Sequence, residues 1–498
     1  MSDPSFLEKF VRSVRPQVLE LDGVDRVSAL IYIFFYYFYA NNSGSRVDFM
    51  PTQLLKDSFF KVLCEFPYLA GVLQRTDDGS LKVVVDMDNL NLPEFKESHS
   101  DMHYDDIEAS GFSLSMLPKD AATTGIFLIN DIKNPAKLAS IHIIRFRENT
   151  GVMVFASISH ALMDGAGYCA FMNRWAEICK HMASGKKPSN LPLRSFSNDR
   201  NAMRQCIPRT RLPPGSLIEH SFIPGGIVSK FFAWLSSTTQ AKVLALLNKF
   251  GQVSHHCYFI SHQKLDAIRE SAISAAPEKQ RLSRNDILMS LLSIAVANSE
   301  NTVNDTEQST GIFQCIKNSI SLALTSKSKV FESSMPIDIR SRIGGMKTMD
   351  YCGNAIVLQR VQNPIDMLQG SITSEMIAKV ASTIRLATDS VDHQYISNYF
   401  KAVNAEPDCF IRATFYGTAP PAKLIASNHT RLAHYQIDFG WGIPAWANPL
   451  EAAAPNLCYV LPAHPSKDGI VVHFMASEES LAQIQKLPIW QDTFEFIH

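Results

Sequence analysis

The sequence carries almost no net charge, because 47 lysines and arginines face 48 aspartates and glutamates among its 498 residues. Proteins that bind nucleic acid usually present a strongly basic surface, so this balance argues against a nucleic-acid partner. The nine cysteines are scattered and include no C-x-x-C pair. A disulfide framework is therefore not expected, and the spacing is typical of reduced thiols in a cytoplasmic protein.

Long apolar runs are also missing. The most apolar segment, residues 29–40 (ALIYIFFYYFYA), is much shorter than the ~20 residues that a membrane-spanning helix needs. Its aromatic and β-branched side chains favour a buried strand. The acidic start at residues 1–5 lacks the basic and apolar regions of a signal peptide. These features predict a cytoplasmic protein without a membrane span.

The composition is that of a globular enzyme, with 46% hydrophobic and 19% charged residues and no internal repeat. A chain of this length is expected to form more than one domain. Residues 183–225 contain clustered proline, glycine, serine and arginine, which indicates a crossing segment. We predict an N-terminal domain over residues 1–190, a crossover linker over 191–230 and a C-terminal domain over 231–498.

Strand and helix patterns recur in both halves of the chain, which predicts an α/β fold with two layered units side by side. A polar, irregular surface excursion is expected at residues 96–122. The apolar periodicity predicts helices at residues 54–63, 166–180, 283–297 and 374–387, and strands at 82–85, 139–147, 152–159, 410–414, 423–426 and 469–475.

A single histidine, His160, follows the apolar run at residues 152–159 and precedes Ala161-Leu162-Met163-Asp164-Gly165. Because a helical pattern starts at Ala166, the motif lies at a strand–loop–helix junction, where an imidazole can face a cleft. Such a place suits a general base. With 15 histidines in the chain, H-x-x-x-D alone is expected by chance about once, and Gly165 makes the match considerably rarer.

A second motif, Asp438-Phe439-Gly440-Trp441-Gly442, is rarer by orders of magnitude. The two motifs, in this order, resemble the signature of BAHD-type acyltransferases, enzymes that move an acyl group from coenzyme A to an alcohol or amine. Further segments resemble the same family along most of the chain, namely residues 54–58, 66–71 (FPYLAG), 171–177, 338–342 (DIRSR) and 351–355 (YCGNA).

The resemblance implies two chloramphenicol acetyltransferase-like domains, each a mixed β-sheet with flanking helices, and a channel between them. Acyl-CoA, most simply acetyl-CoA, would enter as a co-substrate from one face and the acceptor from the other. His160 would be the catalytic base, without an acyl-enzyme, a permanently bound cofactor or a metal. The family default is a monomer. The chain also looks like fungal members that acetylate terpenoid or alkaloid alcohols.

Other motif residues are expected to support the site. In the family the aspartate that corresponds to Asp164 points away from the histidine and pairs with an arginine, for which Arg340 and Arg342 are the candidates. Gly165 would relieve crowding where the chain turns into the helix. Asp438, Gly440, Trp441 and Gly442 would shape the fold rather than contact the reacting atoms.

An oxyanion donor is needed for the tetrahedral intermediate. The family often has a small hydroxyl residue before a Ser-Trp pair at the position of Ser427-Asn428-His429, so Ser427 is the candidate donor. No tryptophan stands there, and His429 is a candidate replacement for the indole N–H. Phosphates of coenzyme A are expected near a predicted helix start that carries basic residues, with Lys279, Arg281, Ser283 and Arg284 as candidate contacts.

Three alternatives stay open at this point. The enzyme could acylate an amine rather than a hydroxyl, or it could be a condensation-type enzyme of the same fold, although those usually carry two adjacent histidines and Ser159 precedes His160 here. A binding homologue without catalysis is the third. The remaining histidines considered, His142, His220, His255, His256 and His434, are expected to be structural or exposed.

Overall fold

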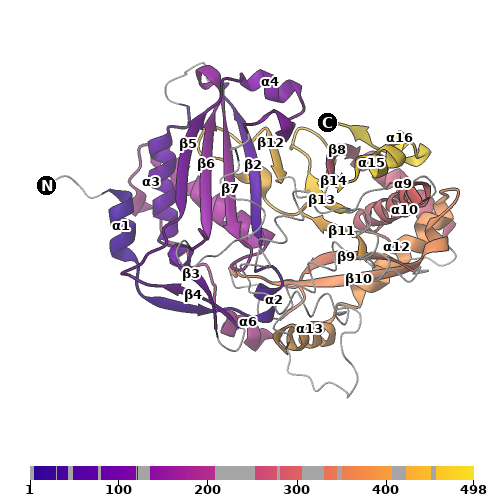
Figure 1. The fold of residues 1–498 in the computed structure, drawn as a ribbon, viewed down its shortest axis with the longest axis horizontal. Coiled ribbons are helices and arrows are strands. Elements are labelled where there is room, and N and C mark those ends of the chain that lie inside the picture. The colour runs from indigo at the N-terminus through magenta and orange to yellow at the C-terminus, as the bar shows by residue number, and fades with distance from the viewer. Residues whose placement is uncertain are drawn as a thin grey trace, which may run out of the picture.

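Two β-sheet regions lie side by side in the computed structural model, with the N-terminal elements in indigo to magenta and the C-terminal elements in orange to yellow (Figure 1). Each region has flanking helices, so the predicted α/β fold class with two such units is confirmed. The structure describes residues 5–29, 31–42, 49–76, 80–118, 121, 135–207, 253–276, 281–304, 330–344, 350–405, 422–449 and 456–498.

The first sheet has the strand order β12-β2-β7-β6-β5. Its central strand β7 pairs with β2 and β6 in antiparallel register, and every residue of β7 is buried. Both faces of the strand therefore lie in the core, as its unbroken apolar run predicted. The strands of this sheet are β2 (Tyr32–Ala40), β5 (Glu94–His99), β6 (Ala139–Arg145), β7 (Gly151–Ser159) and β12 (Trp446–Pro449).

The prediction of an irregular excursion at residues 96–122 was wrong in its first part. Residues 94–99 form β5, which pairs in parallel with β6 at the edge of the sheet, and α4 (Tyr104–Ala109) follows. Along β5 the burial alternates weakly and the side chains are mostly polar. An edge strand of this kind carries little of the apolar periodicity on which the prediction depended.

Strand β12 comes from the C-terminal half of the chain but pairs with β2, with Trp446 opposite Phe38 and Pro449 opposite Phe35. The chain thus returns to the first sheet after most of the second has been built, and Figure 1 shows β12 in yellow beside β2. The domain boundaries drawn from the sequence stay a prediction. Most of the predicted linker lies outside the described residues.

Helices α3 and α5 pack against each other beside the first sheet and share one hydrophobic core with β2 and β7. Trp175 of α5 donates its indole N–H to the Ser58 hydroxyl of α3 over 3.0 Å. A small antiparallel sheet, in the order β1-β4-β3, adjoins this half. The bounds are α1 (Phe6–Ser13), α3 (Thr52–Leu63), α5 (Gly165–Ala183), β1 (Gln17–Glu20), β3 (Val72–Arg75) and β4 (Leu81–Val85).

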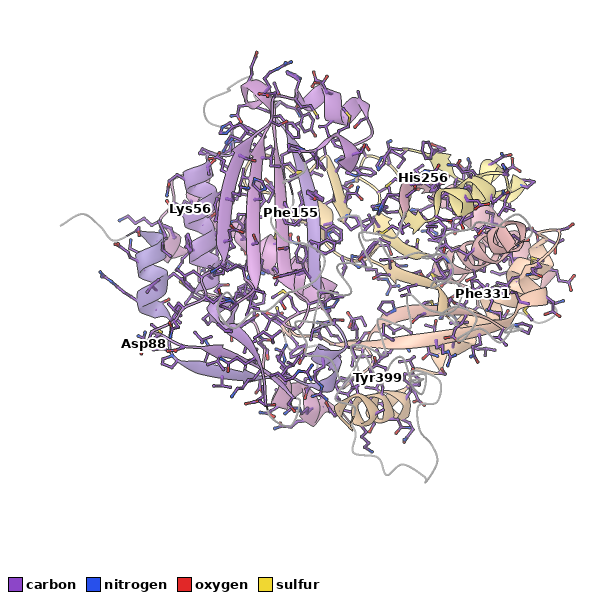
Figure 2. All side chains as sticks on the ribbon, viewed as in Figure 1. Lys56, Asp88, Phe155, His256, Phe331 and Tyr399 are labelled. Carbon is purple, nitrogen blue, oxygen red and sulfur yellow. The ribbon has the colours of Figure 1, made fainter. Side chains whose placement is uncertain are left out.

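The second sheet has the order β10-β9-β11-β13-β14-β8-β15 and packs against α9, α10, α12 and α15 through its own core. Figure 2 labels Phe155 on β7 and Phe331 on β9, both fully buried, which mark the two separate cores. The bounds are β8 (Ser254–Ser261), β9 (Val330–Asp338), β10 (Ile356–Pro364), β11 (Ala422–Asn428), β13 (Leu457–Pro462), β14 (Gly469–Ala476), β15 (Glu495–Phe496), α9 (His262–Ala275), α10 (Arg284–Asn304), α12 (Ser374–Asp389), α15 (Glu478–Gln485) and α16 (Pro488–Thr493).

A third hydrophobic cluster joins the two halves below the sheets, where α2 meets α13. The Gly23 N–H donates to the Asn404 side chain over 2.6 Å, and a Cβ on Gly23 would lie 2.3 Å from the carbonyl carbon of Val403. Only glycine permits this approach. The remaining bounds are α2 (Gly23–Arg26), α6 (Arg200–Cys206), α13 (His393–Ala405), η1 (Pro67–Ala70), η2 (Leu114–Met116), η3 (Arg147–Asn149), η4 (Pro188–Asn190), η6 (Ile365–Leu368) and η7 (His434–Gln436).

The predicted central elements agree with the structure to within a few residues, for example the helix expected at residues 166–180, which is α5. The predicted cap at Ser283 is present, since its hydroxyl accepts from the Asp286 N–H over 3.3 Å. The strand predicted at residues 410–414 lies outside the described residues. Across the described ranges, no helix is both long and apolar enough to cross a bilayer.

Candidate active site

The loop that begins with His160 leaves the central strand β7 and turns into α5. The His160 N–H donates to the Ile31 carbonyl over 2.9 Å, which is the last contact before the chain leaves the sheet. Asp164 caps α5, because its Oδ1 accepts from the N–H groups of Ala166 and Gly167 at 3.1 Å each. His160 is partly exposed, whereas the residues between it and Gly165 are buried. In this loop His160 is therefore accessible to solvent, while residues 161–164 are buried.

Asp164 turns away from His160 and forms a two-pronged ion pair with Arg340, with Nη1 to Oδ2 at 2.9 Å and Nη2 to Oδ1 at 3.0 Å. The Ala355 N–H also donates to this carboxylate, at 2.9 Å. Arg342, the other candidate, instead donates to the carbonyls of Thr388 and Val391. The structure therefore pairs Asp164 with Arg340, which joins the start of α5 to the second half of the chain.

The burial of Asp164 tends to raise the pKa of its carboxyl, but the Arg340 guanidinium and the backbone N–H donors outweigh that effect. The net pKa lies below its ordinary value, so Asp164 is ionised at neutral pH. The carboxylate has its lone pairs engaged by these donors and does not contact the His160 ring through any hydrogen bond found among the described residues. Its geometry is that of a support for the loop.

A second buried network holds the backbone of the same loop. Asn354 donates to the His160 carbonyl and to Asp25 Oδ1, both at 2.8 Å. Arg200 pairs with Asp25 at 3.1 Å and donates to the Leu162 carbonyl at 2.9 Å. All three side chains are buried. Two carbonyls of the loop are therefore anchored from outside it, which fixes the backbone that carries the imidazole.

Sequence reasoning missed Asp25 and Arg200 as part of the site. They lie 175 residues apart and belong to no contiguous motif, so only a structure brings them together. Asn354 stood in the YCGNA segment, but its role was not assigned.

Desolvation is the main influence on His160 and lowers the pKa of the imidazole below its ordinary value of 6.5. Its own backbone carbonyl, Asp164 and Asn354 oppose this shift without cancelling it. The ring is therefore neutral at neutral pH. A neutral imidazole at the end of a strand, partly exposed and rigidly supported, can accept a proton from a bound nucleophile.

Ser427 lies near the end of β11, and its Oγ is 3.0 Å from His429 Nε2. His429 is buried against the start of α5, since a Cβ on Gly165 would lie 3.4 Å from its Cε1. It is near enough to His160 for the charges of the two rings to interact. The structure thus brings both oxyanion candidates, from the second half of the chain, to the loop that carries His160.

Behind His429 lies His434, which was expected to be structural or exposed. Its Nε2 is 3.4 Å from His429 Nδ1, and its Nδ1 is 3.0 Å from the Tyr37 hydroxyl. The two imidazole rings are parallel, with 5.6 Å between their centroids. Tyr37 and His434 are fully buried. Sequence reasoning missed both, because they are 397 residues apart.

The candidate contacts for coenzyme A gather at the start of α10, apart from Lys279, which lies outside the described residues. Arg281 is exposed. Arg284 forms an ion pair with Asp266, at 2.9 Å from Nε to Oδ1, and Ser283 caps the helix. Asn428, next to Ser427, donates to Asn285 of α10 over 2.6 Å. This helix start therefore adjoins the strand end that carries Ser427.

The second motif stands at the other end of α5. Asp438 Oδ1 accepts from the N–H groups of Gly440 and Gly442, and its Oδ2 pairs with Lys180 at 2.6 Å. Both glycines have positive φ, +116° and +106°, a conformation that favours glycine. Trp441 packs edge-on against Phe49. Lys180 is four turns along α5 from Gly165, about 22 Å at 1.5 Å per residue.

Gly167 offers a direct test of how the two halves fit together. A Cβ at this position would lie 2.1 Å from the backbone carbonyl oxygen of Cys352, which cannot move without shifting the segment that carries Asn354. Gly167→Ala is expected to destabilise the fold by about 1–3 kcal/mol or more. The measurement is the urea midpoint of unfolding.

The matched control for that substitution is Gly344→Ala, where an added Cβ meets no described atom within 4 Å. Its urea midpoint should equal that of the wild type. Equal midpoints for both variants would contradict the tight contact between α5 and the Cys352 segment.

This chain is similar in sequence to a known protein family. The model of the Transferase family matches residues 12–488. The chain is 24% identical over 440 residues to shikimate O-hydroxycinnamoyltransferase of Nicotiana tabacum, covering 87% of this chain and 86% of that protein. It is 21% identical over 336 residues to anthranilate N-benzoyltransferase protein 1 of Dianthus caryophyllus, covering 67% and 62%.

Among solved structures, TRI101 of F. sporotrichioides, crystallised with coenzyme A and T-2, superposes with a TM-score of 0.69. The sequences are 14% identical, and the match covers 97% of this chain and all of that one. At this level of sequence identity, the comparison shows only that the two proteins share a fold.

Proposed function

Because the chain belongs to the BAHD acyltransferases of the Transferase family, whose members use acyl-CoA, we propose that it acetylates a hydroxyl group of a hydrophobic small molecule such as a terpenoid or alkaloid. In this proposal His160 is the general base. The observation that carries it is the neutral, partly exposed imidazole on a loop that Arg340 and Asn354 hold from the second half of the chain.

In the proposed reaction the acceptor hydroxyl lies against His160 while its oxygen attacks the thioester carbonyl of acetyl-CoA. His160 takes the hydroxyl proton as the new bond forms. The C–S bond then breaks, and the imidazolium returns the proton to the leaving thiolate. Both substrates are bound together, so proximity supplies much of the rate and no acyl-enzyme is needed.

Ser427 is the proposed donor to the oxyanion of the tetrahedral intermediate. Its hydroxyl stands at a strand end beside the start of α10, where Arg281 and the helix N-terminus could receive the phosphates of coenzyme A. The thioester would then lie between Ser427 and His160. The name of the structural neighbour TRI101, crystallised with coenzyme A, supports the choice of co-substrate.

The function is tested by measuring free thiol release from acetyl-CoA against a panel of terpenoid and alkaloid alcohols, with matched amines. Acetylation of an alcohol, identified by mass spectrometry, is the expected result. Turnover with amines alone would favour N-acylation, which the name of the Dianthus relative makes the second candidate. No turnover with acetyl-, benzoyl- or hydroxycinnamoyl-CoA, although coenzyme A binds in titration calorimetry, would point to a binding homologue.

The pH dependence of kcat/KM should report His160. Because burial lowers the pKa of this imidazole below 6.5, the basic form that catalysis requires predominates at pH 7 and is lost only as the pH falls through the lowered value. The rate should be level from pH 7 upward and fall below pH 6.5. An acid limb with its midpoint above 6.5 would contradict the assignment.

A further inference from the structure

Four side chains form a continuous line that ends beside the proposed reaction centre. Ser427 Oγ is 3.0 Å from His429 Nε2, His429 Nδ1 is 3.4 Å from His434 Nε2, and His434 Nδ1 is 3.0 Å from the Tyr37 hydroxyl. Every nitrogen of the two rings therefore faces another member of the line. Exposure decreases along it, from the partly exposed Ser427 to the fully buried Tyr37.

Both rings in this line are neutral at neutral pH. Burial and the neighbouring His160 lower the pKa of His429 to about 4, and burial and His429 lower the pKa of His434 well below its ordinary value. A neutral imidazole carries one N–H donor and one acceptor nitrogen. Among these four side chains two proton arrangements are consistent, one running toward Ser427 and one running away from it. The Cys169 thiol, whose Sγ is 3.7 Å from His434 Nδ1 and 3.8 Å from Nε2, is a weak additional partner of the His434 ring.

We propose that His434 and His429 are positioning residues that relay hydrogen-bond direction from Tyr37 to Ser427, so that the Ser427 proton points at the acyl oxygen. In this arrangement the Tyr37 hydroxyl donates to His434 Nδ1, and His434 Nε2–H donates to His429 Nδ1. His429 Nε2–H then donates to Ser427 Oγ. The Ser427 oxygen is occupied as an acceptor, and its own O–H is left for the substrate. This inference rests on the proposed acyl transfer.

The opposite arrangement would direct the Ser427 proton into His429 and remove it from the reaction. In that arrangement Tyr37 accepts from His434 Nδ1–H, and its own proton goes to the oxygen of the buried Tyr168 hydroxyl, which in turn donates to the Ala156 carbonyl over 3.1 Å. The proposed arrangement instead leaves the Ser427 O–H free at the partly exposed end of the line, where negative charge develops on the thioester oxygen. Charge on that oxygen stabilises the proposed direction.

The sequence explains why this chain can build such a line. An indole at position 429 would offer one N–H and no acceptor atom. An imidazole can accept from His434 and donate to Ser427 at the same time. The motif glycine Gly165 leaves the room for it, since an added Cβ would contact Leu432 Cδ1 at 3.0 Å and His429 Cε1 at 3.4 Å.

A spectroscopic measurement tests the direction without requiring activity. In the protein labelled with ¹⁵N-histidine, the signals of His429 and His434 are assigned from the single variants His429→Gln and His434→Leu. Both rings are expected to carry their proton on Nε2. Protons on Nδ1 in both rings would overturn the proposal.

Kinetics test the consequence. Ser427→Ala should lower kcat by ~10²-fold, the lower end of the effect of removing an oxyanion donor. His434→Leu should lower kcat severalfold with the KM for acetyl-CoA unchanged, and it should have no further effect in the Ser427→Ala background, because it acts only through that hydroxyl. Multiplicative losses in the double variant would overturn the relay.

Two further variants keep the test decisive. His142→Gln replaces another fully buried histidine, bonded to Ser98 at 2.8 Å on β6, and should leave kcat unchanged. Should His434→Leu not fold, Tyr37→Phe removes only the hydroxyl at the start of the relay and should lower kcat in the same, non-additive way. A wild type without turnover would refute the proposed function alone, while the tautomers would still decide the relay.

Discussion

Replacing His160 by alanine is expected to lower kcat by ~10²–10⁴-fold, the range that a positioned general base contributes. The substitution removes the proton acceptor and keeps the backbone contacts of residue 160, because the N–H to Ile31 and the carbonyl contact with Asn354 do not involve the imidazole. The KM for acetyl-CoA should therefore change little. Initial rates of thiol release with the acceptor found in the alcohol panel measure the effect.

His393→Ala is the matched control, because this histidine is exposed at the start of α13 and far in sequence from the loop. Its kcat should equal that of the wild type. Titration calorimetry with coenzyme A and thermal unfolding should be the same for both variants and the wild type. A kcat of His160→Ala equal to that of the wild type would contradict the assignment of His160 as the base.

The second large effect is on stability. Asp164→Asn should destabilise the protein by up to about 3–5 kcal/mol, because it removes the buried counter-charge of the largely buried Arg340 guanidinium and leaves it paired with the half-exposed Asp338. Asparagine is itself a good N-cap, so its Oδ1 can keep the contacts to Ala166 and Gly167. Its Nδ2 replaces the oxygen that accepts from Arg340 Nη1 and the Ala355 N–H, so the loss includes these two hydrogen bonds as well as the charge. Urea unfolding at pH 7 measures the difference.

The contribution of Asp164 to the free energy of unfolding depends on pH, and its pKa gives the direction. The folded-state pKa of Asp164 lies below the unfolded value of 3.8, so its contribution is fully present above that value and is lost as the pH falls through the lowered one. The gap between wild type and Asp164→Asn should therefore close at low pH. As a control, Asp266→Asn removes the partly exposed partner of Arg284 and should cost at most about 1 kcal/mol at pH 7. Equal losses in the two variants would contradict the special role of the buried pair.

The elements that the sequence predicted best are those buried on several sides. Strand β7 and helix α5 carry unbroken or strongly periodic apolar patterns, because each packs against neighbours over its length. The edge strand β5 and the short strand β12 were not predicted. Polar side chains cover the first, and the second pairs with a strand about 400 residues away, so neither leaves a local pattern.

The residues of the candidate site also differ in how well the sequence predicted them. The loop from His160 to Gly165 is contiguous, so the spacing of its residues was readable directly. The choice between Arg340 and Arg342 was not, since two residues in one turn differ only in the direction of their side chains, and here one reaches Asp164 and the other the carbonyls after α12. Tyr37 and His434 join the site only through the packing of the two halves.

Strand β12 has a consequence for biosynthesis. The sheet that carries His160 obtains its last edge from residues 446–449, which are made about 400 residues after the strand β2 with which they pair. Until then, β2 presents an unpaired backbone edge to other nascent chains. We expect the first half to complete its folding only after residues 446–449 have left the ribosome. A gene split between the halves should yield fragments that must associate before the first sheet is complete.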